Sequence, residues 1–358
     1  MSIDRSVRGL MVLALLPLFG QTFAQAPISL PCKYGDKACA FAALRDHSAA
    51  KRSFWEQAFG EPLEKRMGAA PPELVEHLAL ANIRDAYPNN PAAATPAADF
   101  ARDVRDAIAE LPDRIVELLR DRLAGVYFVD DLGGTGFTVP IQDRAKKIVG
   151  GIVVLDRAVL SAHTANAWAT WKENTPFKPD PGVRLSAQIA TASQDNRKNA
   201  IQYILLHEFG HVLAGGGNWH PPWIFPPKKP ESTASYPFFG LSWSVDWEAG
   251  RFITQFDGDF PRRRNVVYYL EPKLAADEIR DVYTSLEKTN FATLYAATHP
   301  WDDFAEAFVN YVHTMLMRRP FKISIYRDGK LEKEYGSCWE QPRCAEKRTL
   351  LEKMFGGT

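Results

Sequence analysis

The sequence lacks an excess of charge of either sign and, beyond its first residues, lacks any long apolar run. Lysine plus arginine and aspartate plus glutamate each total 43 among 358 residues. A net charge near zero provides no electrostatic footprint for nucleic acid or for an anionic membrane surface. After residue 24, no stretch is long and apolar enough to cross a bilayer. We therefore expect no nucleic-acid partner and, once a leader has been removed, no membrane attachment.

Cysteine is scarce, and its placement is informative. The only four are Cys32 and Cys39 near the beginning, and Cys338 and Cys344 near the end. Four cysteines allow three connectivities, and pairing between near neighbours predicts two small loops closed in an oxidising compartment. A metal site is the weaker interpretation, because neither pair has the two-residue spacing of zinc knuckles.

The N-terminus has the features of a secretion signal. Arg5 and Arg8 precede a short apolar run over residues 10–19, and residues 22–24 provide a small-residue cleavage site. We predict that residues 1–24 are a signal peptide and that the protein is periplasmic or secreted. The alternative is an uncleaved anchor helix, for which the apolar run is short.

The remaining chain divides at a stretch rich in proline and alanine. Apolar residues at helical spacing between residues 36 and 87 predict an N-terminal helical segment. Together with the linker that follows, this segment spans residues 25–98. The second predicted region, residues 99–358, begins with a helix and continues into β-strand patterns.

Two of these strand patterns, residues 126–129 and 137–139, flank the glycine-rich residues 133–136 and predict a β-hairpin. The glycines lack the spacing and the lysine of a phosphate-binding loop, so they indicate a turn. Residues 148–155 are rich in β-branched side chains and predict another strand. Residues 215–259 interleave tryptophan with proline, which predicts a long ordered loop or a lid. It is either a surface loop that folds its aromatic side chains onto the core or a wall of the substrate cleft.

The motif HEFGH at residues 207–211 carries the strongest functional signal. Asp195 or Asn196 can cap a helix whose apolar residues recur at helical spacing, and the glycines at residues 215–217 end it. Coincidence is the alternative explanation of the motif. It would leave two histidines without partners among mostly apolar neighbours, which is costly.

The chemistry of the motif follows from its helical spacing. His207 and His211 lie one turn apart on the same face and can converge on one tetrahedral ion. Glu208 is offset enough to reach a water on that ion instead of the ion itself. The motif therefore predicts one zinc ion per chain, held by His207 and His211, with Glu208 as the general base.

The stretch from His299 onward predicts a second buried helix that supplies a third ligand. A proline stands at the first helical position, acids follow in the first turn, and aromatic residues form a core face. At about 100° per residue, Asp302, Glu306 and His313 form one stripe along the margin of that face. Asp303 is expected to point further out.

These two helices resemble the gluzincin clan of zinc metallopeptidases, which includes thermolysin and the protease domain of anthrax lethal factor. Residues 304–308 repeat the Phe-Ala-Glu-Ala-Phe core of the corresponding lethal factor helix. The resemblance implies that Asp302 binds zinc and that Glu306 hydrogen-bonds a zinc-bound histidine. This chain has aspartate where glutamate is usual, so Glu306 is the alternative third ligand. The resemblance covers the HEFGH helix and roughly residues 295–315.

Tyr295 stands seven residues before Asp302, at the position of the active-site tyrosine of lethal factor. The resemblance implies that Tyr295 donates a hydrogen bond to the oxyanion, with His299 as a competing donor. His220 and His313 are expected in a loop or behind the ligands, not as ligands themselves.

The sequence thus predicts an α+β, zincin-like fold with a small mainly antiparallel sheet, a buried HExxH helix and a mostly helical remainder. Residues 99–358 would form the catalytic domain, and similarity to zincins makes residues 148–155 the edge strand that pairs with an extended substrate. The predicted function is a zinc-dependent endopeptidase that acts on a peptide or protein. The alternatives are a non-catalytic, zinc-stabilised envelope binding protein and a zinc hydrolase of a non-peptide amide. The oligomeric state is not predicted.

Overall fold

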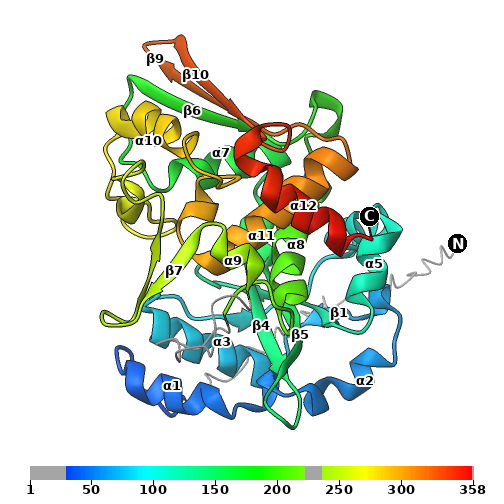
Figure 1. Ribbon diagram of the computed structural model, residues 1–358. Coiled ribbons are helices and arrows are strands. Elements are labelled where there is room, and N and C mark those ends of the chain that lie inside the picture. The colour runs from blue at the N-terminus through cyan, green and yellow to red at the C-terminus, as the bar shows by residue number, and fades with distance from the viewer. Residues whose placement is uncertain (1–29, 222–235, 357–358) are drawn as a thin grey trace, which may run out of the picture.

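The computed structural model describes residues 30–221 and 236–356, and this part of the chain has an α+β architecture (Figure 1). Its described residues form twelve α-helices, a mixed five-stranded sheet and two small antiparallel sheets. The predicted α+β class is therefore confirmed. The predicted signal peptide, residues 1–24, lies outside the described residues.

The main sheet is mixed, so the prediction of a mainly antiparallel sheet is wrong. Its order is β1-β3-β5-β4, and β2 also pairs with β3. β1 and β5 run parallel to β3, whereas β2 is antiparallel to β3 and β4 is antiparallel to β5. The strands are β1 (Met67–Ala69), β2 (Ala92–Ala93), β3 (Leu123–Asp130), β4 (Gly136–Gln142) and β5 (Ile148–Asp156).

The position of β5 overturns two further predictions. β5 lies between β3 and β4, so residues 126–129 and 137–139 do not form a hairpin. Residues 148–155 contain no polar side chain, and such a strand is stable where both of its faces are covered. The edge position goes to β4, in which Pro140 lacks the N–H that an interior strand needs. Residues 148–155 are therefore not the edge strand.

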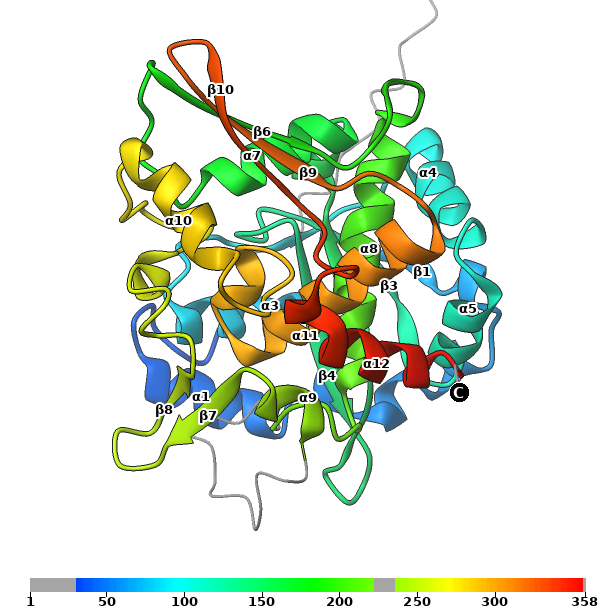
Figure 2. The same ribbon diagram turned by 45° about the horizontal axis from the view of Figure 1, so that its top comes forward.

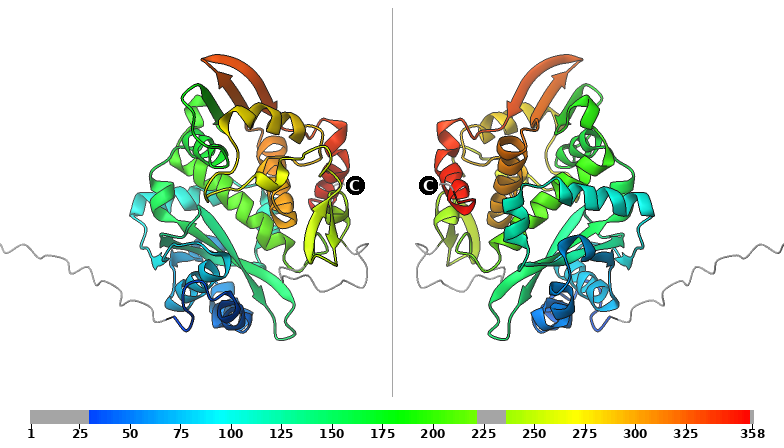
Figure 3. Two further views of the ribbon diagram at one scale, coloured as in Figure 1. Left: turned by 90° about the vertical axis from the view of Figure 1, so that its left-hand side faces the viewer. Right: turned by 90° about the vertical axis from the view of Figure 1, so that its right-hand side faces the viewer.

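Alternate residues of β5 point into separate cores on the two faces of the sheet. Ile152 and Val154 pack in a core that includes Leu74 of α3, and Figure 3 shows the N-terminal helices on that face. Val153 and Leu155 face the larger core, to which α8 contributes. The N-terminal residues contain the helices α1 (Lys37–Arg45), α2 (Glu56–Phe59) and α3 (Pro72–Asp85). The same segment supplies β1 and β2 to the sheet.

Two helices lie side by side in the middle of the molecule, α8 (Arg197–Ala214) and α11 (Pro300–Tyr311) (Figures 1 and 2). Asn196 caps α8 by accepting a hydrogen bond from the backbone N–H of Asn199, as predicted for one of two candidate caps. α11 begins with proline at its first position and continues into a π-helical turn, residues Val312–Leu316. Both predicted helices are confirmed.

The remaining elements surround this pair. A three-stranded antiparallel sheet in the order β10-β9-β6 lies at the top of Figure 1. Its strands are β6 (Val183–Gln188), β9 (Lys322–Arg327) and β10 (Lys330–Gly336). The other helices are α4 (Ala98–Ala109), α5 (Asp113–Leu119), α6 (Arg157–Ser161), α7 (Ala165–Asn174), α9 (Pro237–Gly240), α10 (Ile279–Leu286) and α12 (Ala345–Met354).

The tryptophan- and proline-rich segment, residues 215–259, is more regular than predicted. Where the structure describes it, the segment contains α9 and an antiparallel pair, β7 (Trp243–Asp246) and β8 (Arg251–Thr254). The prolines stand before these strands, so they do not interrupt the pairing. Residues 222–235 of the predicted loop lie outside the described residues.

The predicted disulfides are confirmed. Cys32 bonds to Cys39 and Cys338 bonds to Cys344. Two disulfides fit a protein that matures in an oxidising compartment. Over residues 30–221 and 236–356, no helix has the length and apolar character needed to cross a bilayer.

Candidate metal centre

The side chains of His207, His211 and Asp302 converge on one point between α8 and α11. Nε2 of His207 and Nε2 of His211 are 3.2 Å apart, and Oδ1 of Asp302 lies 3.6 Å from Nε2 of His211. The three side chains offer ligand atoms that all lie within 4.8 Å of one another. This group can bind a metal ion, and two imidazoles with one carboxylate are donors that suit zinc.

Local structure explains the convergence. The one-turn spacing of the two histidines places both rings on the face of α8 that meets α11. His299 caps α11 by accepting a hydrogen bond from the backbone N–H of Trp301 at 3.4 Å. This cap fixes the first turn of α11, and the same turn carries Asp302 toward the histidines.

Glu306 lies one turn further along α11 and contacts the other side of His207. Its Oε1 is 2.9 Å from Nδ1 of His207, the nitrogen that faces away from His211. Its Oε2 accepts a hydrogen bond from the Thr293 hydroxyl at 2.6 Å. Burial acts to raise the pKa of Glu306, but Lys172 and His207 outweigh it and hold that pKa well below its usual range. Of the two candidate third ligands, Asp302 is the one the structure groups with both histidines.

Glu208 is set apart from the three candidate ligands. Its Oε2 accepts a hydrogen bond from the Thr138 hydroxyl of β4 at 2.6 Å. A Cβ atom on Gly136 would lie 2.7 Å from its Oε1, so only glycine fits there without displacing the carboxylate. Burial raises the pKa of Glu208 to about 7, against the opposing effects of His211 and Thr138. A carboxylate with this pKa is poised to accept a proton near neutral pH.

Tyr295 packs directly on His207, one of the candidate ligands. Its ring stacks on the His207 ring with centroids 5.6 Å apart and planes 28° apart. Burial, with Asp302 as the next contribution, raises its pKa well above the usual value, so the phenol keeps its proton and can donate a hydrogen bond. The competing donor, His299, is held by its capping role, and burial lowers its pKa to about 4.

His313 and His220 each contact a backbone carbonyl oxygen. Nε2 of His313 lies 2.8 Å from the carbonyl oxygen of Ile189 and 3.1 Å from that of Pro320. Nδ1 of His220 lies 2.9 Å from the Pro221 carbonyl oxygen. The structure therefore places neither histidine among the candidate ligands.

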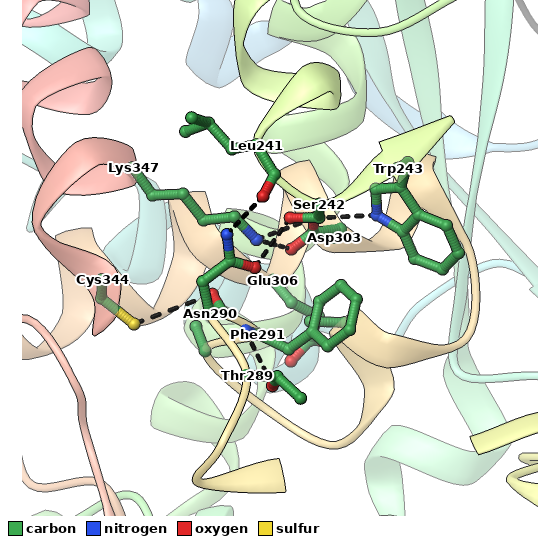
Figure 4. Close-up of polar contacts among 12 residues, drawn as sticks. Leu241, Ser242, Trp243, Thr289, Asn290, Phe291, Asp303, Glu306, Cys344 and Lys347 are labelled. Atoms are coloured by element: carbon green, nitrogen blue, oxygen red, sulfur yellow. Dashed lines mark hydrogen bonds and ion pairs between the residues drawn. The ribbon is translucent and has the colours of Figure 1, made fainter. Parts of the chain in front are cut away.

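Asp303 does not point outward as predicted. It is fully buried, and both of its oxygens contact Nζ of Lys347 in α12, at 2.5 and 2.8 Å (Figure 4). Trp243 donates a third hydrogen bond to it at 3.0 Å. α12 packs over the outer side of α11, so the side that sequence periodicity marks as exposed is covered.

Four residues of the site carried no signal in the sequence. Thr138 hydrogen-bonds to Glu208, and Gly136 leaves room for the Glu208 carboxylate. Lys172 and Thr293 both hydrogen-bond to Glu306. All four lie outside the two motif helices. Threonine, glycine and lysine are common residue types, so only the folded structure shows which of them reach the site.

A cavity of about 760 Å³ opens behind the Gly134 turn, and neither the candidate ligands nor Glu208 lines it. Gly134 in its wall stands two residues before Gly136, and Tyr269 in its wall lies with its ring centroid 6.3 Å from that of Tyr295. The backbone of Tyr269 has a φ of 63°, a left-handed conformation that aromatic residues rarely adopt. The lining residues are Asn89, Asp130, Asp131, Gly133, Gly134, Asp156, Ala158, Val159, Trp171, Thr175, Tyr269 and Leu270.

A scan of the chain against protein-family models found no matching family, and searches of curated proteins and of solved structures found no match.

Proposed function

We propose that this chain is a single-zinc metallopeptidase that hydrolyses peptide bonds. The observation that carries the proposal is the grouping of His207, His211 and Asp302 around one point, with the Glu208 carboxylate held separately beside it. Three protein ligands leave a coordination position open, as in catalytic zinc sites, whereas structural sites fill all four with protein side chains.

In this proposal the zinc ion and the protein side chains have different roles in the reaction. A bound zinc ion would lower the pKa of water and polarise the scissile carbonyl. Glu208 accepts the proton of the attacking water and returns it to the leaving amine. Thr138 keeps the Glu208 carboxylate in one orientation, and the phenol of Tyr295 donates a hydrogen bond to the oxyanion.

The open edge of β4 supports a peptide as the substrate. The Asp156 N–H donates to the Thr135 carbonyl, so the backbone groups of alternate residues, Gly136 and Thr138, face away from β5. Over residues 136–141, no strand covers this edge among the described residues. An extended peptide that pairs with Gly136 and Thr138 would lie beside Glu208.

The two alternatives explain less of the site. A zinc-stabilised binding protein has no use for a buried carboxylate poised near pH 7 and separate from the ligands. A zinc hydrolase of a non-peptide amide would use the same ligands and base, but it would not need an open strand edge. The disulfides support a periplasmic or secreted location for the enzyme.

The experiment that tests the proposal combines metal content with hydrolysis of casein or of a peptide library. Glu208→Gln should keep zinc and lose nearly all hydrolysis, whereas His211→Ala should lose zinc. Glu61→Gln, at an exposed position remote from the site, is the control and should match the wild type in both. Hydrolysis that survives Glu208→Gln would reject the base, and zinc retained by His211→Ala would reject the ligand.

A further inference from the structure

Lys172 in α7 is a buried cation that points toward the metal-binding group. Only 4% of the residue is exposed. Its Nζ lies 3.0 Å from Oε1 of Glu306 and 3.7 Å from Oε1 of Glu173. Removing a cation from water is costly unless it is paired, and Lys172 has two carboxylate neighbours.

Glu173, the second carboxylate beside Lys172, is itself held by hydrogen bonds. Oε2 of Glu173 accepts hydrogen bonds from the hydroxyl groups of Tyr268, at 3.0 Å, and Tyr283, at 2.7 Å. Both tyrosines are buried. Glu173 therefore has little freedom to move, and neither has the lysine packed against it.

Lys172 touches two groups that each touch His207. Glu306 shares its Oε1 between Nζ of Lys172 and Nδ1 of His207. Nζ of Lys172 also lies 4.7 Å from the centroid of the Tyr295 ring, whose stacking partner is His207. A cation at this distance attracts the face of the ring. The orientation of the His207 imidazole is thus constrained through two contacts that both begin at Lys172.

We propose that Lys172 is a positioning residue of the metal centre, which fixes Glu306 and Tyr295 so that His207 presents Nε2 to the ion. The inference rests on the proposed function. It extends that function to a residue of α7 that contacts neither the metal-binding nitrogen of His207 nor Asp302.

The arrangement differs from an ion pair that only joins two helices. Thr293 binds the second oxygen of Glu306, so both oxygens of this carboxylate are fixed. The first oxygen, Oε1, contacts Nδ1 of His207, a candidate metal ligand. Partners of this kind orient a ligand histidine, and their loss typically weakens metal binding by about 10- to 100-fold.

The test is the dissociation constant of zinc, measured by competition with a chelator of known affinity on the folded, full-length mature protein. Lys172→Met should raise that constant by about 10- to 100-fold. Thr293→Val removes the other restraint on Glu306 without leaving a charge unpaired, so it should raise the constant by a smaller factor, about tenfold or less. An unchanged constant in Lys172→Met would overturn the inference, whatever Thr293→Val shows.

A double variant shows whether Lys172 acts through Glu306. Glu306→Gln alone should weaken zinc binding, and adding Lys172→Met should weaken it by less than about threefold more, because the shared path has already been cut. The double variant leaves no charge at Glu306, and Glu173 keeps its hydrogen bonds from Tyr268 and Tyr283. If the two effects simply multiply, Lys172 does not act through Glu306 and the inference fails.

A matched control separates positioning from general stability. Lys347 forms a second buried lysine–carboxylate pair among the described residues, with Asp303 (Figure 4). Lys347→Met should lower the melting temperature and leave the zinc constant within about threefold of wild type. An equal loss of zinc affinity in Lys347→Met and Lys172→Met would mean that any buried cation matters equally, which contradicts the inference. If Lys172→Met does not fold, Thr293→Val and the double variant decide.

Failure of the inference and failure of the proposed function give different results. Wild-type protein that does not bind zinc overturns the proposed function. Wild-type protein that binds zinc and loses activity in Glu208→Gln, but retains its affinity in Lys172→Met, overturns only the role of Lys172.

Discussion

A Cβ atom on Gly210 of α8 would lie 2.8 Å from the Cα of Ala305 in α11. The two helices that carry the candidate ligands therefore touch backbone to backbone. Gly210 stands next to His211, and Ala305 lies one turn beyond Asp302, or three residues. This contact sets how closely Asp302 can approach the two histidines.

Gly210→Ala should push α8 and α11 apart. Alanine normally stabilises a helix relative to glycine, by about 1 kcal/mol, so a loss of stability here has to come from the contact with Ala305. We expect an unfolding free energy lower by about 1–3 kcal/mol and weaker zinc binding, measured by chemical denaturation and chelator competition. Gly240→Ala, where an added Cβ meets nothing within 4 Å, is the control: it should leave zinc binding unchanged and should not lower the unfolding free energy. Unchanged zinc affinity in Gly210→Ala would show that the approach of the helices is not limiting.

Gly136→Ala should displace the general base without removing the metal. The new Cβ would lie 2.7 Å from Oε1 of Glu208, so the carboxylate has to move. We expect kcat to fall by about 10- to 100-fold, because a misplaced base loses most of its contribution, while the zinc content stays that of the wild type.

Gly134→Ala provides the matched control for this prediction. An added Cβ there would meet only the Gly136 carbonyl oxygen, at an ordinary 3.8 Å. Equal losses of kcat in the two variants would indicate a general disturbance of the strand and not a displaced Glu208.

Thr138→Val should change how activity depends on pH. The Thr138 hydrogen bond lowers the pKa of Glu208, which burial raises to about 7. Without it the pKa rises further, and a base has to be ionised to accept a proton. The acidic limb of the kcat/KM profile should therefore move to higher pH, so that activity falls more at about pH 6 than at about pH 8. Thr138→Ser keeps the hydroxyl, so its acidic limb should lie at the wild-type pH. If the acidic limb of Thr138→Val also lies at the wild-type pH, Thr138 does not lower the pKa of Glu208.

The helices of the site were predictable because their signals are local. The spacing of His207 and His211, the cap at Asn196 and the proline that opens α11 are all read within one helix. The order of the strands was not predictable, because it depends on which strand is covered on both faces. Buried partners are also distant in the chain: Lys172 and Glu306, for example, lie 134 residues apart. Asp303 was misjudged for the same reason, since α12 covers a face that periodicity alone marks as exposed.

Acid should destabilise the fold through His77 of α3. Burial, together with the neighbouring His47, lowers the pKa of His77 from 6.5 to about 3. As the pH falls below 6.5, the unfolded chain takes up a proton that the folded protein does not, so stability is lost at about 1.4 kcal/mol per pH unit until the pH approaches the folded pKa. His77→Phe removes this proton uptake. Urea denaturation between about pH 6.5 and pH 5 should show a shallower decline in the variant, and an identical decline would contradict the assignment.

The measurement that tests the central claim most directly is an anomalous difference map, collected at the zinc absorption edge from crystals grown with zinc. We expect one peak per chain, coordinated by Nε2 of His207, Nε2 of His211 and a carboxylate oxygen of Asp302, with a position left for water next to Glu208. A map without a peak at this group, or a peak whose open position is filled by a fourth protein side chain, would contradict the account.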